Sequence, residues 1–64
     1  MSTVAKYYFE DYDSYTAAVK RMCSEVGDNG SWDCNRPYIW IYDSCDYVAL
    51  AGKVCQAHGG EACN

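Results

Sequence analysis

Two short runs of the chain have the aromatic and β-branched composition of strands. Residues Val4 to Tyr12 are rich in Tyr and Phe, and residues Tyr38 to Tyr42 read Tyr-Ile-Trp-Ile-Tyr. Such side chains favour the pleated, half-buried surface of a sheet. Both runs are therefore predicted to be strands.

Each predicted strand is followed by apolar residues that recur with the period of a helix. Each periodic segment begins after an Asp-Ser pair, which is a common helix start, and stops at a glycine, which closes a helix without a Cβ penalty. The pattern predicts two amphipathic helices, one over 15–26 after Asp13-Ser14, ending at Gly27, and one over 47–58 after Asp43-Ser44, ending at Gly59.

A stretch rich in turn formers separates the two strand-helix units. Asn29-Gly30 and Arg36-Pro37 flank a short segment, Ser31 to Cys34, that is predicted to pair with the second strand as a hairpin. Residues 61–64 leave room for only a short last strand. The order βαββα with a short terminal strand predicts an α+β fold, a ferredoxin-like α/β sandwich with two helices on one face of a small antiparallel sheet. At this length, residues 1–64 make a single domain.

Alternation along the strands assigns many aromatic side chains to the face of the sheet that the helices leave open. Ile39 and Ile41 are expected to point toward the helices, as are Tyr7 and Phe9. Cross-strand aromatic pairs stabilise a sheet by themselves, but a contiguous aromatic patch on a small protein is also typical of a contact surface. We predict that a partner binds the outward aromatic side chains, which are Tyr8, Tyr12, Tyr38, Trp40 and Tyr42.

The net charge of the chain limits the classes of partner that are expected. Nine acidic and five basic residues give a net charge of −4, the wrong sign for a nucleic-acid backbone or an anionic membrane. Sheets that stack RNA bases are surrounded by Lys and Arg, whereas here Glu10, Asp11 and Asp43 flank the aromatic runs. A protein or cell-surface target is therefore expected rather than nucleic acid. No apolar run approaches the roughly 20 residues of a membrane span, so no transmembrane segment is expected.

Five cysteines in 64 residues are typical of a small disulfide scaffold made for an oxidising compartment. Since Cys23 and Cys55 lie near the ends of the two predicted helices and each is followed by another cysteine after the chain reverses, we predict the bridges Cys23–Cys34 and Cys55–Cys63. Cys45, in the expected first turn of the second helix, is then the free thiol and is placed to bridge a partner. We expect a secreted protein, and expect these residues to be its mature chain without the signal peptide.

The chain carries no recognised catalytic set. Cys45 as a nucleophile needs a base, and the single histidine, His58, lies roughly 20 Å away at the other end of the same predicted helix. Cys55 and His58, with Cys63 nearby and Cys34 or Cys23 elsewhere in the chain, offer zinc ligands, although their spacing is not that of paired zinc knuckles. We expect no enzyme activity, cofactor or metal, and keep an intracellular zinc-binding domain as an alternative. Asn29-Gly30-Ser31 matches a glycosylation sequon.

The segment Val54 to Cys63 reads Val-Cys-x-x-x-Gly-Gly-x-x-Cys. Together with the cysteine-rich βαββα order, it resembles the killer-toxin-like α/β sandwich proteins, small secreted fungal proteins such as the salt-mediated yeast and smut-fungus killer toxins. The resemblance implies a secreted, non-enzymatic toxin-like or effector-like protein that acts on a cell-surface, membrane or protein target. It also implies assembly from two chains, so we expect one subunit of a homo- or hetero-dimer. A secreted recognition module or inhibitor without toxicity is a second alternative.

Overall fold

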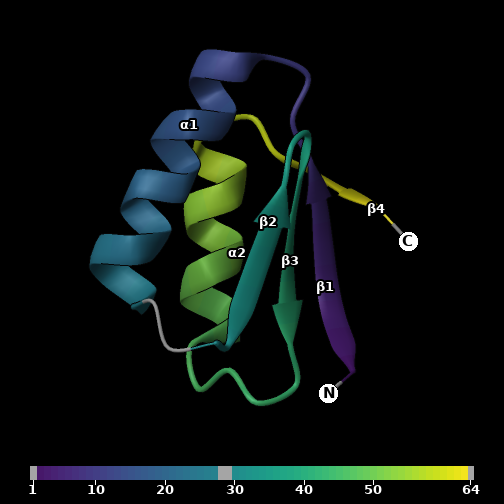
Figure 1. The fold of residues 1–64 in the computed structure, drawn as a ribbon, viewed down its shortest axis with the longest axis vertical. Coiled ribbons are helices and arrows are strands. Elements are labelled where there is room, and N and C mark those ends of the chain that lie inside the picture. Colours follow the sequence, from purple (N-terminus) through teal and green to yellow (C-terminus); the bar gives the residue numbers. More distant parts are fainter. Residues whose placement is uncertain (1, 28–29, 64) are drawn as a thin grey trace.

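A computed structural model describes residues 2–27 and 30–63 (Figure 1). These residues form a four-stranded antiparallel sheet and two helices, and the first helix continues as a π-helical turn. In chain order the elements are β1 (Thr3–Tyr8), α1 (Tyr12–Arg21), the π-helical turn η1 (Met22–Val26), β2 (Trp32–Asn35), β3 (Tyr38–Tyr42), α2 (Val48–Ala57) and β4 (Glu61–Cys63). The predicted α+β class is confirmed, as are both helices and the short last strand.

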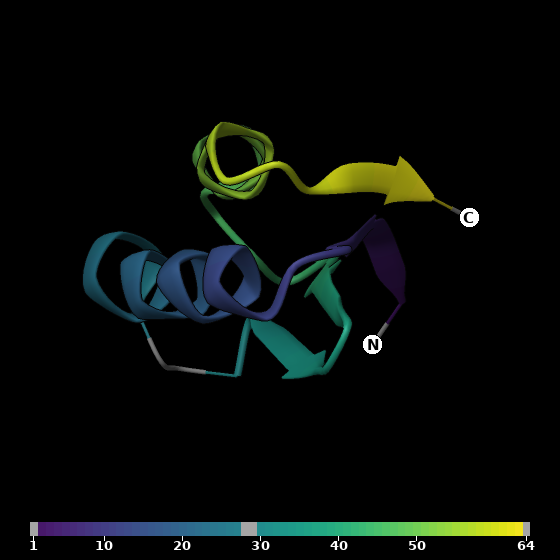
Figure 2. The same cartoon turned by 90° about the horizontal axis from the view of Figure 1, so that it is seen from above.

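The sheet has the strand order β2-β3-β1-β4, and every neighbouring pair is antiparallel. In β1, Lys6 lies opposite Trp40 and Tyr8 lies opposite Tyr38 of β3, and the register shifts between Thr3 and Ala5. β4 pairs with β1 only over Lys6–Tyr8. Figure 2 shows that α1 and α2 both lie on one side of the twisted sheet. Neither of the described helices covers the other side of the sheet.

Helix α1 begins at Tyr12, three residues earlier than the sequence pattern predicts. Asp11 has an extended backbone, and its Oδ2 accepts hydrogen bonds from the backbone N–H and the hydroxyl of Ser14, at 2.9 and 3.1 Å. A carboxylate that accepts the amide three residues later is the usual N-cap. The expected start at Asp13-Ser14 is therefore wrong, and Tyr12 belongs to the helix rather than to the first strand.

Helix α2 begins after a turn rather than at the expected Asp43-Ser44 pair. The backbone N–H of Asp43 donates to the carbonyl of Ser2 at 2.7 Å, which joins the end of β3 to the start of the chain. The cap residue is instead Tyr47, without a side-chain capping bond. Because this turn intervenes, Cys45 precedes α2 and does not lie in its first turn.

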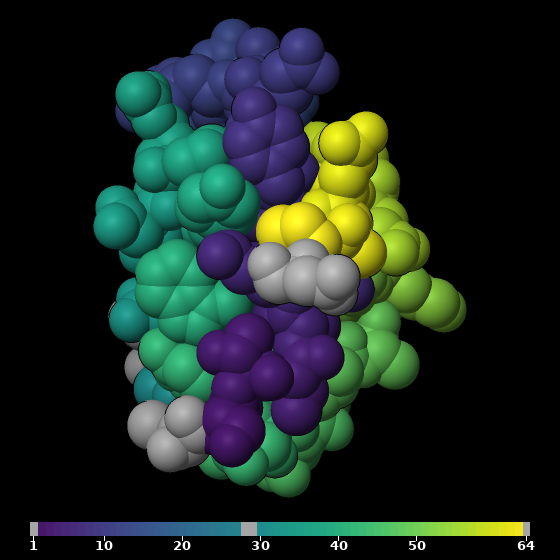
Figure 3. All heavy atoms as spheres, turned by 90° about the vertical axis from the view of Figure 1, so that its right-hand side faces the viewer, coloured from purple at the N-terminus to yellow at the C-terminus, as the bar shows by residue number. Residues whose placement is uncertain are grey.

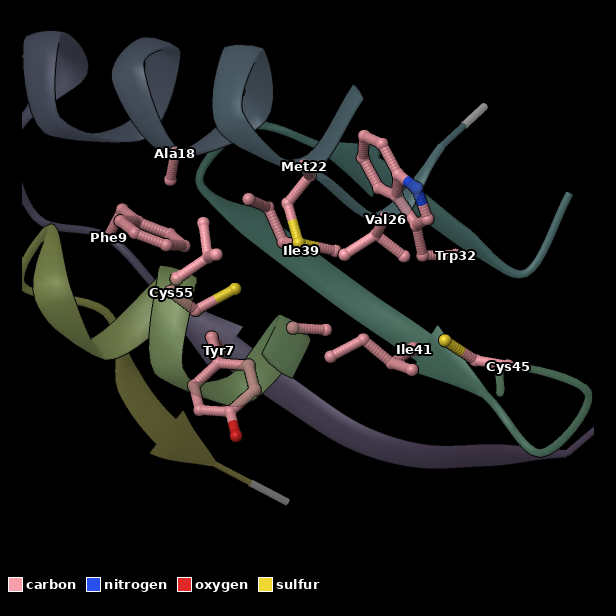
Figure 4. Packing of buried hydrophobic residues seen from close by; sticks show 12 residues of the cluster. Tyr7, Phe9, Ala18, Met22, Val26, Trp32, Ile39, Ile41, Cys45 and Cys55 are labelled. Atoms are coloured by element: carbon pink, nitrogen blue, oxygen red, sulfur yellow. The ribbon is translucent and has the colours of Figure 1, made fainter. Parts of the chain in front are cut away.

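A single apolar core fills the space between the sheet and the helices (Figure 4). Among the described residues, three aromatic side chains and two cysteines join seven aliphatic side chains in this core. The cysteines fit there because a reduced cysteine behaves as a small apolar group. Trp32 is anchored there by a hydrogen bond from its indole Nε1 to the carbonyl of Gly27 at 2.6 Å. The core consists of Tyr7, Phe9, Ala18, Met22, Val26, Trp32, Ile39, Ile41, Cys45, Ala51, Val54 and Cys55.

Candidate interaction surface

Four of the five predicted partner-binding residues lie on the side of the sheet away from the helices. Along β3 the side chains alternate strictly, with Ile39 and Ile41 fully buried and the three aromatic residues between and beside them half-buried. We name the outer aromatic surface by its members, Tyr8, Tyr38, Trp40 and Tyr42, together with Lys6. Figure 3 looks onto this side of the molecule, where β1, β3 and β4 lie next to one another.

The rings of the outer aromatic surface are held by contacts with each other. The centroids of the Tyr8 and Tyr38 rings lie 5.7 Å apart, and the Lys6 ammonium lies 4.3 Å from the Tyr38 centroid. The indole Nε1 of Trp40 donates to the hydroxyl of Tyr42 at 2.8 Å. Cation–π contacts and tilted aromatic pairs of this kind each contribute about 0.5–1.5 kcal/mol. Contacts within the chain therefore position the rings of this surface.

Acidic residues lie at the margins of this surface. Directly opposed residues of antiparallel strands share one face of the sheet. Asp33 of β2 lies opposite Trp40, and Glu61 of β4 lies opposite Tyr8. The aromatic centre is thus flanked on both edge strands by a carboxylate, an arrangement that matches the apolar core and polar rim of protein interfaces.

Tyr12 does not belong to the outer aromatic surface, and its predicted place there is wrong. It is the first residue of α1 and is 58% exposed. Its ring lies 4.9 Å from the guanidinium carbon of Arg36, which follows β2. The cause is the early cap at Asp11, which turns the chain into a helix before Tyr12 can continue the strand.

All five cysteines are free thiols in the structure, and neither predicted disulfide is at bonding distance. Cys55 is buried in the core, whereas Cys63 lies opposite Lys6 and so belongs to the outer face. The sheet therefore separates the members of this pair.

The other predicted pair is separated along α1. Cys34 lies opposite Ile39 on the inner face, next to Tyr15 in the first half of α1. Cys23 is exposed on η1, eight residues beyond Tyr15 and thus about 12 Å farther along the helix axis.

Cys45 is a free thiol like the other four cysteines, but it is not placed to bridge a partner. Its side chain is 7% exposed, and its sulfur accepts a hydrogen bond from the backbone N–H of Tyr47 at 3.4 Å. Because the turn before α2 folds this thiol into the core, the exposed thiol of the chain is Cys23 instead.

The candidate zinc ligands do not come together. Within residues 2–27 and 30–63, no three His, Cys, Asp or Glu side chains are grouped so as to hold a metal ion. Burial raises the pKa of the Cys55 thiol to about 11, which disfavours the thiolate that zinc requires. This geometry does not support the alternative of a zinc-binding domain. The sequon residue Asn29 lies outside the described residues.

A charged cluster at the ends of the two helices is only partly predictable from the sequence. Arg21 donates from Nε to Glu25 Oε2 at 2.6 Å, and its Nη1 lies 3.4 Å from Nε2 of His58, the C-cap of α2. The hydrogen bond from Arg21 holds the pKa of the Glu25 carboxyl below its usual value and raises that of Arg21. The i,i+4 spacing of Arg21 and Glu25 is readable in the sequence, but His58 is 37 positions away.

In the part of the chain that the structure describes, neither helix is long and apolar enough to cross a membrane. Comparison of this chain with models of protein families, with curated proteins and with solved structures finds no match.

Proposed function

We propose that this chain is a non-enzymatic binding protein that engages a protein partner through the outer aromatic surface. The observation that carries the proposal is the position of four neighbouring aromatic side chains on the sheet face that the two described helices leave uncovered. Tyr and Trp are enriched in the centres of interfaces, where they supply a large contact area at a small entropic cost. The acidic margins at Asp33 and Glu61 supply the polar rim.

The proposed fold is a ferredoxin-like α/β sandwich. The order of elements supports it, and so does the strand order, which read from β4 is β4-β1-β3-β2. This order places β3 between β1 and β2, as in a split βαβ unit.

In its narrower form, the proposal is a secreted toxin-like or effector-like protein that acts on a protein or cell-surface target. The cysteine-rich composition and the resemblance of the Val54–Cys63 segment to killer-toxin-like proteins support this form. We further propose that it works as one subunit of a homo- or hetero-dimer, because a small sheet with two edges favours association.

The test compares the wild type with Trp40→Ala and with a matched control, Tyr47→Ala, which removes an aromatic ring that is 56% exposed at the start of α2. Purified proteins are applied to panels of fungi and bacteria, and their self-association is followed by sedimentation over a wide range of concentration. Far-ultraviolet circular dichroism checks that both variants fold.

We expect Trp40→Ala to weaken inhibition or association tenfold or more, as a central interface residue does, and Tyr47→Ala to leave both unchanged. If the wild-type protein inhibits the growth of no organism at any concentration, the toxin proposal is rejected. The alternative of a recognition module without toxicity then remains. Equal behaviour of Trp40→Ala and wild type in every assay would reject the outer aromatic surface as the binding site.

A further inference from the structure

Opposed residues of the four strands form rows that cross the outer face of the sheet, because directly paired residues of antiparallel strands share a face. From β2 to β4, one row is Asp33, Trp40, Lys6 and Cys63. The next row on this face is Asn35, Tyr38, Tyr8 and Glu61. A carboxylate therefore begins one row on β2, and another ends the next row on β4.

Asp33 and Glu61 are separated by the width of the outer aromatic surface. Neighbouring strands lie about 4.8 Å apart and successive rows on one face lie about 6.8 Å apart, which places the Cα atoms of the two residues about 16 Å from each other. Both side chains are exposed. Oδ1 of Asp33 accepts a hydrogen bond from the backbone N–H of Cys34 at 2.8 Å, which holds this carboxylate in place. The surface thus has two negative ends with aromatic rings between them.

The middle of the surface differs in charge from its ends. The Lys6 ammonium lies 4.3 Å from the centroid of the Tyr38 ring, so it covers this ring and repels a second cation above it. Trp40, next to Lys6 in the same row, offers its indole to an apolar group. A complementary partner therefore carries basic groups at two ends and apolar groups between them. The net charge of −4 favours such a partner over a second copy of this chain, because like charges repel.

A segment that covers the face of a sheet must satisfy its own backbone. The strands already pair their N–H and C=O groups with one another, so a segment on the face must pair its backbone groups within itself. A helix does so, and about 11 residues of helix span about 16 Å. Residues eleven positions apart also return to the same side of the helix, since each turn takes about 3.6 residues. The spacing of the two carboxylates therefore suits a helix.

We propose that the partner is an amphipathic helix of another protein that lies across the outer aromatic surface. Its apolar residues cover Trp40, and two basic residues about three turns apart pair with Asp33 and Glu61. In helix recognition of this kind apolar anchors at helical spacing supply affinity, while charges at the margin set orientation and selectivity. The inference rests on the proposed function and names the form and the charge of the partner.

The test titrates isotope-labelled protein with a synthetic helical peptide in which two Lys eleven positions apart flank Leu at helical spacing. Two matched peptides have Glu in place of both Lys, or a central Pro that breaks the helix. The chemical shifts of the Trp40 indole N–H and of the Tyr38–Tyr42 amides report binding. The same titrations use a charge-reversal variant, Asp33→Lys with Glu61→Lys. The control, Asp46→Lys, reverses an exposed carboxylate in the turn before α2.

We expect the Lys peptide to shift the Trp40 signals, and the Glu and Pro peptides to bind about tenfold more weakly or less. The charge-reversal variant should lose about tenfold in affinity for the Lys peptide and gain affinity for the Glu peptide. Asp46→Lys should bind as the wild type does at about 0.15 M salt, where distant charges are screened. If circular dichroism shows that the reversal unfolds the protein, the neutral pair Asp33→Asn with Glu61→Gln should abolish the preference for the Lys peptide.

Three outcomes would overturn the inference without touching the proposed function. Equal binding of the Lys and Glu peptides at Trp40 would exclude a basic partner, and equal binding of the Lys and Pro peptides would exclude a helix. With no shift at Trp40 for any peptide, the helix proposal fails, and the comparison of Trp40→Ala with Tyr47→Ala still decides the proposed function. Shifts at Trp40 that depend on protein concentration without peptide would assign the surface to a second copy and overturn the foreign helix.

Discussion

The phenolic oxygen of Tyr7, on β1, lies against the bare Cα of Gly52 in α2, where an added Cβ would approach it to 2.8 Å. Both residues are buried, so the close approach of the helix to the sheet depends on this glycine. Gly52→Ala gains about 1 kcal/mol of helix propensity but forces an overlap that costs about 1–3 kcal/mol. We expect a net loss of about 1 kcal/mol in the free energy of unfolding, measured in urea.

A double-mutant cycle identifies the cause of that loss. In Tyr7→Phe the hydroxyl is absent, so Gly52→Ala should become neutral or stabilising there. An equal effect of Gly52→Ala in both backgrounds would mean that Tyr7 is not the obstacle.

The strands and helices follow from local pattern, whereas several positions of single residues do not. The alternation along Tyr38–Tyr42 predicts which side chains are buried and which point outward, because successive side chains of a strand point to opposite faces of the sheet. The choice of Asp11 over Asp13 as the cap of α1 is not readable, since both are good caps and the folded chain decides between them. The face of Cys63 depends on its register with β1, a contact distant in sequence. The approach of Arg21 to His58 likewise follows from the packing of two helices.

The cap of α1 gives a prediction with a control in the same turn. Asp11→Ala removes the acceptor for the Ser14 amide and should lower the free energy of unfolding by about 1 kcal/mol. Asp13→Ala removes only a favourable charge near the helix start, which contributes about 0.3–1 kcal/mol. Thermal unfolding of the two variants side by side measures the difference. A larger loss in Asp13→Ala would place the cap where the sequence pattern first suggested it.

The two tryptophans make a second matched pair. Trp32→Phe leaves the Gly27 carbonyl without its indole donor and reduces the volume of the core, so a loss of about 1–3 kcal/mol is expected. Trp40→Phe also loses an indole hydrogen bond, but on the outer face, where water replaces it, and should cost well under about 1 kcal/mol. Equal losses in urea unfolding would contradict the division into a buried and an outward tryptophan.

Stability should fall at alkaline pH because buried acids hold their protons in the folded state. Burial raises the pKa of Cys55 from 9.0 to about 11, and burial with a hydrogen bond to Cys34 raises that of Tyr15 from 10.0 to about 12. The folded state therefore binds more protons than the unfolded state above pH 9, and the free energy of unfolding decreases from there through pH 11.

For Cys55 alone, the expected decrease is about 1–2 kcal/mol. Urea unfolding at a series of pH values measures it. Cys55→Ala should be less stable at pH 7, because it leaves a cavity, but should show a shallower decrease between pH 9 and 11. Parallel curves for Cys55→Ala and wild type would contradict burial as the cause.

The reactivity of the five thiols tests the arrangement of the cysteines directly. Alkylation requires a thiolate that the reagent can reach. The exposed Cys23 should therefore be alkylated first in the native protein. Cys45 and Cys55, which are 7% and 0% exposed, should react only after unfolding, with Cys55 further protected by its raised pKa. Peptide mapping after timed alkylation gives the order.

The intact mass of the untreated protein can contradict the arrangement of five free thiols. A mass below that of the reduced chain, with Cys23 joined to Cys34 in the peptide map, would establish a bridge between two cysteines that the fold holds apart. In that case η1 and β2 would have to shift against each other on oxidation, since Cys34 lies next to Tyr15 in the first half of α1, whereas Cys23 lies on η1 beyond the end of that helix.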